Sequence, residues 1–286
     1  MRFTTYLDRG QARLGVVSDQ DVIDLNRAQP QISADLRTAL RQGQDLAGAA
    51  ATAIASSAPR LPLASLQLAP LLPEPGKIVC LGLNYYDHAK EGGREKPVYP
   101  WFFMRTATSL LAPGAKALRP KVSERLDYEA ELAVVIGQRV KHCTLDNALD
   151  AVFGYSVFND ISVRDYQKKT PQWSIGKNFD RTGPFGPVLV TADELPPGAT
   201  DLRIQARLNG QVMQDANTRD MIWGVAETIM LLSECMTLEP GDVIIMGTPA
   251  GVGQARTPPV WMKHGDTIEI DIERIGVLRN TIEDEA

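Results

Sequence analysis

The sequence predicts a β-rich α+β fold, with a small N-terminal α/β domain ahead of a larger, strand-dominated domain. Three observations lead to this prediction. Short β-branched and apolar runs alternate with turn residues throughout residues 77–286, which contain few helical patterns. The first 70 residues instead combine short strands with an Ala-rich stretch. Between them, residues 59–76 hold five prolines, which remove backbone donors and stiffen a connector. We therefore expect domains at 1–70 and 71–286.

The N-terminal domain begins with residues that alternate like strands, with a turn at Asp8-Arg9-Gly10. Residues 33–57 are rich in alanine and predict one or two helices, with a break near Gly43. The strands are expected at residues 2–7, 12–18 and 22–25.

The larger domain contains one clear hairpin signal, Asn209-Gly210, between two strand-like runs. Residues 220–235 predict its clearest helix, because Ile222, Val225, Ala226, Ile229 and Leu232 form one apolar stripe. This pattern favours an α+β domain over a doubly wound sheet. Strands are expected at residues 77–83, 127–137, 151–158, 188–191, 202–208, 242–246 and 267–272.

Composition excludes several classes of function. The chain has 286 residues, a net charge of -5 and no basic cluster interleaved with aromatics, which argues against nucleic acid as a partner. No apolar run is long enough to span a bilayer, and the N-terminus lacks the apolar core of a signal peptide. The three cysteines lie far apart, which predicts three buried, reduced thiols rather than a metal site. We expect a cytoplasmic protein with no membrane partner.

The most informative stretch is Asp127-Tyr128-Glu129-Ala130-Glu131, at the start of a predicted strand. Because side chains alternate along a strand, its three carboxylates share one face. Such a face needs positive charge if it is buried. A hard divalent cation such as Mg²⁺ or Mn²⁺ would supply it. A solvated edge with fortuitous acids is the alternative. Asp160, which follows an apolar strand, is either a further ligand or the N-cap of a helix at 162–167, and the local pattern favours the cap.

Histidine and lysine candidates for acid–base chemistry are few. His88 and Glu91 lie three residues apart and would form a dyad on one face of a helical turn, or only a surface pair. Gly92-Gly93 would follow as a lid hinge or a helix stop. Lys177, in a segment rich in Gly and Pro, would balance the carboxylates or extend along the surface. His142 and His264 lie in turn-like segments and are expected to be idle.

A tight loop at 247–253 follows the predicted strand at 242–246. It lacks the ending of a phosphate-binding loop. Its turn would present Thr248 and backbone amides to a small anionic ligand.

Taken together, these segments resemble the fumarylacetoacetate hydrolase family. Each motif is weak alone, but six in the same order over residues 75–282 are specific. The resemblance implies a mixed β-sandwich or roll as the catalytic domain, after a variable N-terminal domain. The motifs are GLNY at 82–85 with His88 and Glu91, DYEAE at 127–131, FNDISVRDYQ at 158–167, GKNFD at 176–180, GTPAGVG at 247–253, and Gly265-Asp266.

The resemblance also implies residue roles. The metal ligands would be Glu129, Glu131 and Asp160, with Mg²⁺ or Mn²⁺ as the ion and Ca²⁺ as an alternative, which replaces the cap interpretation of Asp160. The catalytic group would be His88, Glu91 and Lys177, and the substrate contacts would be Arg105, Arg164, Gln167 and Thr248. Two positions depart from the family pattern, Arg105 for a frequent lysine and Met246 for a frequent threonine.

The implied reaction is hydrolysis of the carbon–carbon bond of a small β-diketo acid of the acylpyruvate or fumarylpyruvate type, as in aromatic catabolism. The products would be pyruvate and a carboxylic acid. Decarboxylation of an oxaloacetate-type acid and isomerisation of an unsaturated keto diacid would use the same site. A non-catalytic, metal-stabilised binding protein is a third hypothesis. The partners implied are a small anionic keto acid and a second copy of the chain, as a homodimer.

Overall fold

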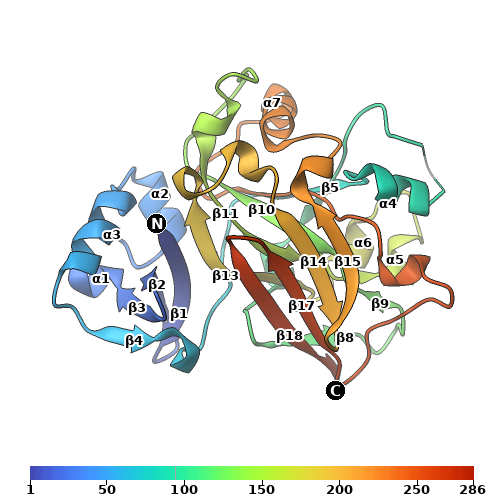
Figure 1. Cartoon of the computed structure of the whole chain (residues 1–286), viewed down its shortest axis with the longest axis horizontal. Coiled ribbons are helices and arrows are strands. Elements are labelled where there is room, and N and C mark those ends of the chain that lie inside the picture. Colours follow the sequence, from blue (N-terminus) through green and yellow to red (C-terminus); the bar gives the residue numbers. More distant parts are fainter. Residues whose placement is uncertain (94) are drawn as a thin grey trace.

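The computed structural model describes residues 1–93 and 95–286. It confirms a strand-rich α+β fold, built around two stacked sheets (Figure 1). In the described residues the larger sheet runs in the order β4-β3-β2-β1-β13-β11-β10-β16-β5-β6, with β7 beside β13. Its strands are β1 (Arg2–Asp8), β2 (Gln11–Ser18), β3 (Asp21–Asp24), β4 (Arg60–Pro62), β5 (Ile78–Gly82), β6 (Trp101–Arg105), β7 (Leu110–Leu111), β10 (Ala130–Ile136), β11 (Val152–Asn159), β13 (Gly183–Thr191) and β16 (Val243–Ile245).

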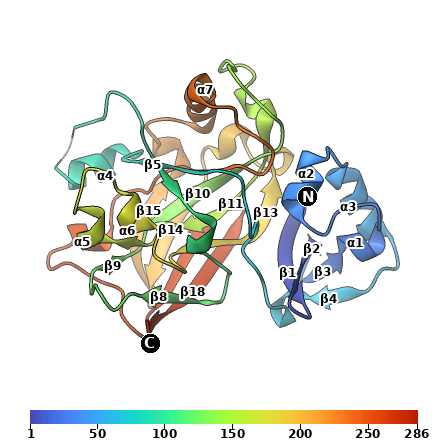
Figure 2. The same ribbon diagram turned by 180° about the vertical axis from the view of Figure 1, so that it is seen from behind.

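The second sheet lies across one face of the first, as both views of the ribbon show (Figures 1 and 2). Its order is β15-β14-β17-β18-β8, and a separate pair joins β12 to β9. Apolar side chains of β10, β14 and β17 fill the space between the sheets and form the main core. The strands are β8 (Lys116–Arg119), β9 (Leu126–Asp127), β12 (Ser162–Val163), β14 (Arg203–Leu208), β15 (Gln211–Asn217), β17 (Thr267–Ile272) and β18 (Gly276–Asp284).

Helices cover the remaining faces. The helices α1, α2 and α3 pack on β1 to β3 at one side of the molecule, while α4, α5 and α6 gather at the other (Figure 2). The α-helices are α1 (Leu25–Ala28), α2 (Leu36–Arg41), α3 (Leu46–Ala55), α4 (Tyr86–Glu91), α5 (Arg164–Gln167), α6 (Ser174–Lys177) and α7 (Val225–Cys235). Single 3-10 turns are η1 (Leu63–Ser65), η2 (Ala107–Ser109), η3 (Ala148–Ala151), η4 (Ala192–Glu194), η5 (Pro197–Ala199), η6 (Thr218–Asp220) and η7 (Gly253–Ala255).

The N-terminal strands join the large sheet directly, because β1 pairs antiparallel with β13. A second core cluster also draws on both parts of the chain, since Phe3 and Leu14 are in it with Cys80 and Ala133. The boundary near residue 70 stays a prediction, and residues on both sides of it share this sheet and this cluster.

Most predicted N-terminal elements and the Asn209-Gly210 hairpin are confirmed. The break near Gly43 is also confirmed, with Gly43 at φ 63° between α2 and α3. This positive φ favours glycine.

Three predictions are corrected. The helix predicted at 220–235 begins only at Val225, because Asn84 holds the preceding segment: its carbonyl accepts from the Ile222 N–H and its side chain accepts from the Trp223 N–H. The strand predicted at 127–137 is divided into β9 and β10. The three cysteines are free, but only Cys80 is buried, and Cys235 is exposed at the end of α7. In the described part of the chain, every helix is too short or too polar to cross a bilayer.

Candidate metal centre and active-site cavity

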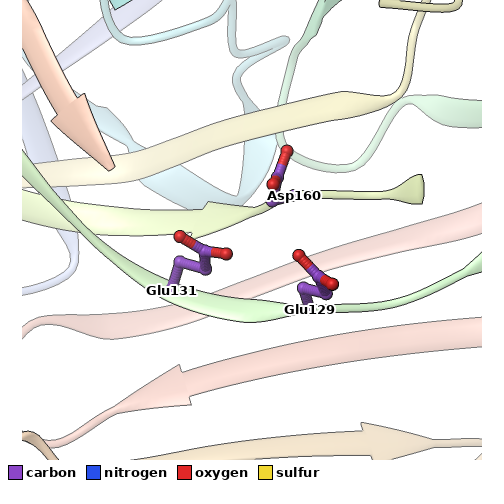
Figure 3. Close-up of side chains that lie close together, drawn as sticks. All are labelled: Glu129, Glu131 and Asp160. Atoms are coloured by element: carbon purple, nitrogen blue, oxygen red, sulfur yellow. The ribbon is translucent and has the colours of Figure 1, made fainter. Parts of the chain in front are cut away.

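Three carboxylates meet where β10 and β11 lie side by side. Glu131 is on β10, Glu129 directly precedes that strand, and Asp160 directly follows β11. The antiparallel register pairs Ala130 with Asn159, which brings these strand ends together. One oxygen from each carboxylate lies within 4.8 Å of the others, and all three side chains are buried (Figure 3). The β-strand alternation that predicted a shared face for Glu129 and Glu131 therefore holds.

Cationic side chains surround two of these carboxylates. Lys177 Nζ, at the end of α6, lies 2.6 Å from Glu129 Oε2 and 2.5 Å from Asp160 Oδ2. Arg105 Nη1 lies 2.6 Å from the other oxygen of Asp160, and Arg164 Nη1 lies 2.7 Å from Glu129 Oε1. The Lys177 side chain is 2 % exposed, so it is a buried partner of the carboxylates and not a surface lysine.

This arrangement perturbs proton affinities in opposite directions. Burial alone would raise the pKa of Glu129, but Arg164 and Lys177 hold it well below its usual range. For Lys177 the directions are reversed. Burial alone would lower its pKa, but the charges of Asp160 and Glu129 raise it. The two groups are therefore held as an ion pair.

Glu131 differs from its neighbours. Its Oε2 accepts a hydrogen bond from the Gly247 N–H at 2.6 Å, and no Lys or Arg among the described residues pairs with it. Burial, then the charges of Asp160 and Glu129, raise its pKa well above the usual range. Glu131 is thus the one carboxylate of the three that forms no ion pair with a described residue.

Asp127 belongs to the support of the site and not to the cluster. Its carboxylate accepts from Arg164 Nε at 2.8 Å and from the backbone N–H groups of Gly253 and Gln254. It therefore fixes Arg164 and the η7 loop in place.

A count of charges tests whether a cation suits this site. Four buried acids, Asp127, Glu129, Glu131 and Asp160, face three buried cations, Arg105, Arg164 and Lys177. Ionisation of Glu131 would leave one negative charge that these three cations do not balance, inside a cluster of hard oxygen donors without Cys or His. These residues fit a hard divalent cation.

Asp160 does not cap the following helix. The N-cap of α5 is Val163, without a side-chain hydrogen bond, and both Asp160 oxygens instead contact Arg105 and Lys177. The local cap interpretation is therefore wrong, because long-range ion pairs take the carboxylate.

His88 and Glu91 form the predicted pair on α4. His88 Nδ1 lies 3.3 Å from Glu91 Oε2, and Glu91 Oε1 accepts from the Gly251 N–H at 2.9 Å. The second contact ties α4 to the 247–253 loop, so Glu91 is held from both sides. Gly92 then ends the helix. A carboxylate on Nδ1 fixes the imidazole tautomer, with the proton on Nδ1 and the lone pair on Nε2.

One cavity of about 380 Å³ brings most of these residues together. The dyad of His88 and Glu91 lines it together with Glu129 and Glu131. Part of its wall is polar and part is apolar. Its lining includes Arg164, Gln167, Lys177, Thr248, Leu81, Phe103, Trp173 and Val252.

Two predicted substrate contacts have partners within the protein. Gln167 Oε1 accepts from Arg164 Nη1 at 3.0 Å, and the Thr248 hydroxyl accepts from Gln214 Nε2 at 2.8 Å. Arg105 lies behind Asp160, is 3 % exposed, and is not part of the cavity wall described. Its guanidinium also donates to the Thr182 hydroxyl. The geometry gives Arg105 a charge-balancing place, where the resemblance implied a substrate contact.

The aromatic wall was missed by the sequence reasoning. Trp173 and Phe103 pack edge to face at 6.0 Å between ring centroids. A Cβ on Gly82 would lie 2.0 Å from the Trp173 ring, so glycine is required there for the ring to fit. The glycine of the GLNY motif was the signal for a close neighbour, although it did not name that neighbour.

Comparison with known proteins was made on this geometry. The family model for the fumarylacetoacetate (FAA) hydrolase C-terminal domain matches residues 77–283. The chain belongs to the fumarylacetoacetate hydrolase family. Its members in this comparison carry different reaction names.

A human relative, oxaloacetate tautomerase FAHD2A, mitochondrial, is 39% identical over 263 residues, covering 91% of this chain and 83% of its own. The structure of maleylpyruvate hydrolase from Sphingobium sp. SYK-6, in complex with manganese (II) ion and pyruvate, has a TM-score of 0.82 and 30% identity, with both chains fully covered. The 2-hydroxyhepta-2,4-diene-1,7-dioate isomerase from Mycobacterium marinum has a TM-score of 0.78 and 29% identity, covering 100% of this chain and 99% of that one. Family membership thus places the chain in a family of enzymes, and the reaction names of its relatives differ.

Proposed function

We propose that this protein is a divalent-metal-dependent enzyme that converts a small 2-oxo acid through its enolate. Its reaction is hydrolysis of the carbon–carbon bond of an acylpyruvate, which gives pyruvate and a carboxylic acid. The observation that carries the proposal is that the His88–Glu91 dyad lines the same cavity as Glu129 and Glu131. For this chemistry, the general base and the residues that would hold the metal must face the same cavity.

His88 is the general base in this proposal. It takes a proton from water, whose oxygen attacks the acyl carbonyl carbon. The bond from that carbon to C3 of the pyruvate unit breaks, and its electron pair remains on the pyruvate unit as the enolate. The proton then returns to C3. Glu91 orients the imidazole, because the Gly251 N–H and His88 hold its two oxygens.

A bound divalent cation would supply Lewis-acid stabilisation for the negative charge of the 2-oxo acid and its enolate. Glu129, Glu131 and Asp160 are the residues that would hold it. Lys177 keeps Glu129 ionised and holds Glu129 and Asp160 in position, which preorganises the site. The apolar wall of Leu81, Phe103 and Trp173 provides room for the acyl group.

A second candidate is keto–enol tautomerisation of an oxaloacetate-type acid. The human relative that bears this name is 39% identical across 91% of the chain, which favours this reaction. Tautomerisation needs only proton transfer between C3 and the enol oxygen, and one base such as His88 can carry it out. Sequence similarity thus favours the tautomerase, whereas the apolar wall favours a substrate with a larger acyl group.

The deciding experiment follows pyruvate release from a simple acylpyruvate and enol-to-keto conversion of oxaloacetate on the same preparation. Each is measured with Mg²⁺, with Mn²⁺ and with a chelator. Metal-dependent pyruvate release supports the hydrolase, and tautomerisation above the free-metal background without release supports the second candidate. Pyruvate formed from oxaloacetate itself would instead indicate decarboxylation. Metal-dependent heat stability without turnover of any keto acid would favour a binding protein.

His88→Ala is the matched variant for this assay. It should lower turnover by about 10²–10⁴-fold, the typical contribution of a positioned base. Metal-induced thermal stabilisation should remain, because His88 is not part of the carboxylate cluster. His264→Ala, which removes an exposed histidine in a turn that is not part of the cavity lining described, is the control. Full activity of the His88 variant would contradict the assigned role.

The same preparation tests the expected oligomeric state. Light scattering after size exclusion measures whether the chain is the homodimer that the family resemblance implies. A cytoplasmic location remains a prediction, and the name of the human relative places that protein in mitochondria.

A further inference from the structure

Gln214 is a buried side chain, 1 % exposed, that bridges the two sheets. It lies on β15, at the end of the strand order of the second sheet (Figure 1). Its Oε1 accepts from the Ala130 N–H on β10 of the first sheet at 2.9 Å, between the two glutamates of the carboxylate cluster. Its Nε2 donates to the Thr248 hydroxyl and to the Pro249 carbonyl, each at 2.8 Å. One amide therefore joins the strand of the cluster to the loop at 247–253.

Backbone groups fix the orientation of this amide. The Ala130 N–H can only donate, so the atom beside it is the amide oxygen. The Pro249 carbonyl can only accept, so the atom beside it is the amide nitrogen. A half-turn of the Gln214 amide would lose both bonds. Its NH₂ group has two hydrogens, and the Thr248 hydroxyl and the Pro249 carbonyl take both of them.

The Thr248 hydroxyl is consequently an acceptor from Gln214, and its own hydrogen must point to another partner. Thr248 is buried and lines the cavity of about 380 Å³. No acceptor for this hydrogen is found among the described residues. A buried O–H without an acceptor is costly, which indicates that an oxygen of a ligand in the cavity completes it.

The loop packs closely against β15 at this point. Gly251 has a φ of 102°, and a Cβ there would lie 2.2 Å from the Met213 carbonyl oxygen and 3.3 Å from the Cα of Gln214. Glycine is what allows the two backbones to approach this closely. The Tyr128 hydroxyl also donates to the Gly251 carbonyl, at 3.1 Å. Backbone packing therefore sets the separation between Gln214 and Thr248.

We propose that Gln214 is a positioning residue that fixes the Thr248 hydroxyl as a hydrogen-bond donor to an oxygen of the bound 2-oxo acid. Gln214 is not part of the cavity wall described, so it acts through Thr248 and does not touch the substrate. A carboxylate or enolate oxygen only accepts, so a hydroxyl held as a donor is already set for this anion before binding. The inference rests on the proposed function, because it needs a 2-oxo acid in this cavity.

Pyruvate, the product of the proposed reaction, is the probe. Titration calorimetry with Mg²⁺ present measures its affinity without turnover. Thr248→Val removes the hydroxyl and should weaken binding by about tenfold, the effect of one hydrogen bond to a charged group, whereas Thr248→Ser should keep the affinity. Gln214→Glu keeps an acceptor for the Ala130 N–H but replaces the NH₂ group with an oxygen, which would take the Thr248 hydrogen. It should weaken pyruvate binding by about the same factor.

The double variant separates positioning from a general structural role. If Gln214 acts through Thr248, Gln214→Glu combined with Thr248→Val should bind pyruvate about tenfold more weakly than wild type, and not about a hundredfold. The metal-induced rise in melting temperature should persist in Gln214→Glu. Effects that multiply in the double variant would overturn the proposal. Loss of the metal-induced rise would also overturn it, because Gln214 would then act on the carboxylate cluster.

Two further variants control for charge and folding. Gln211→Glu adds the same charge at an exposed position of β15 and should leave pyruvate affinity unchanged. Gln214→Asn is neutral and one carbon shorter, so it cannot reach both Ala130 and Thr248, and it should show the same non-additivity with Thr248→Val if Gln214→Glu does not fold. Wild-type affinity in the Gln214 variants would refute the positioning role alone. If pyruvate does not bind wild type, the proposed function fails and the role of Gln214 fails with it.

Discussion

Replacing Glu131 with glutamine should have opposite effects on stability in the two states of the protein. It should stabilise the metal-free protein, or leave it unchanged, and destabilise the metal-loaded protein relative to wild type. Without metal, wild-type Glu131 is buried beside Asp160 and Glu129 with no cationic partner among the described residues. Their oxygens lie within 4.8 Å of one another, where two unit charges repel by roughly 3.5 kcal/mol or more at an effective dielectric constant of 20. Protonation relieves part of this in wild type. Glutamine removes the charge and keeps an oxygen for the Gly247 N–H.

We therefore expect Glu131→Gln to be at least as stable as wild type in a chelator, by about 0–2 kcal/mol. With Mg²⁺ at 100 times its dissociation constant, wild type gains about 2.7 kcal/mol. For a chain of this length that gain corresponds to a rise of roughly 5 °C in the unfolding temperature. The variant, which lacks one ligand charge, should show little of that rise.

Calorimetric melting with EDTA and with Mg²⁺ or Mn²⁺ measures both effects. Glu129→Gln is the contrasting variant, because it breaks pairs with Arg164 and Lys177 and should cost about 3–5 kcal/mol even in EDTA. The reasoning is refuted if Glu131→Gln melts well below wild type in EDTA, or if it keeps the full metal-induced rise.

Three further predictions use other parts of the chain. Lys177→Met leaves two buried carboxylates short of positive charge and should cost about 3–5 kcal/mol in chemical denaturation, with partial recovery on adding metal; a neutral effect would deny its charge-balancing role. Gly176→Ala would place a Cβ 2.3 Å from the Gln167 backbone nitrogen and should cost about 1–3 kcal/mol and raise KM, whereas unchanged melting would show that α5 and α6 can move apart. Burial alone would raise the pKa of Asp24, but hydrogen bonds, first from Arg13, lower it. The resulting stabilisation is present above the unfolded-state pKa of about 4 and is lost as pH falls through the lower folded-state pKa. Asp24→Asn should therefore cost about 1–3 kcal/mol at pH 7 and progressively less in melts below pH 4.

The positions of most strands along the chain and the acidic face could be predicted because they depend on local periodicity. Alternation placed Glu129 and Glu131 together, and Asn209-Gly210 fixed a hairpin. The start of α7 could not be predicted, since Ile222 fits the apolar stripe but Asn84, more than a hundred residues earlier, accepts its backbone N–H and keeps it out of the helix. Local pattern carries no information about such a partner.

The role of Asp160 shows the same division. A carboxylate before a predicted helix is most simply a cap, and the family resemblance, not the local pattern, pointed to the cluster. The structure shows why the local reasoning failed: Arg105 and Lys177 reach Asp160 from separate elements. Two charged hydrogen bonds in a buried site outweigh one cap.

By itself, the sequence determined the fold class, the family resemblance, the shared face of Glu129 and Glu131, and the spacing of the His88–Glu91 pair. These follow from the chain's periodicity and from motifs a few residues long. The tertiary structure alone decided that Glu131 has no ion-pair partner among the described residues, that Arg105 lies behind Asp160, and that Arg125 and Lys168 line a second cavity. Charge compensation and cavity shape depend on residues brought together from distant segments, and no local pattern specifies which residues those are.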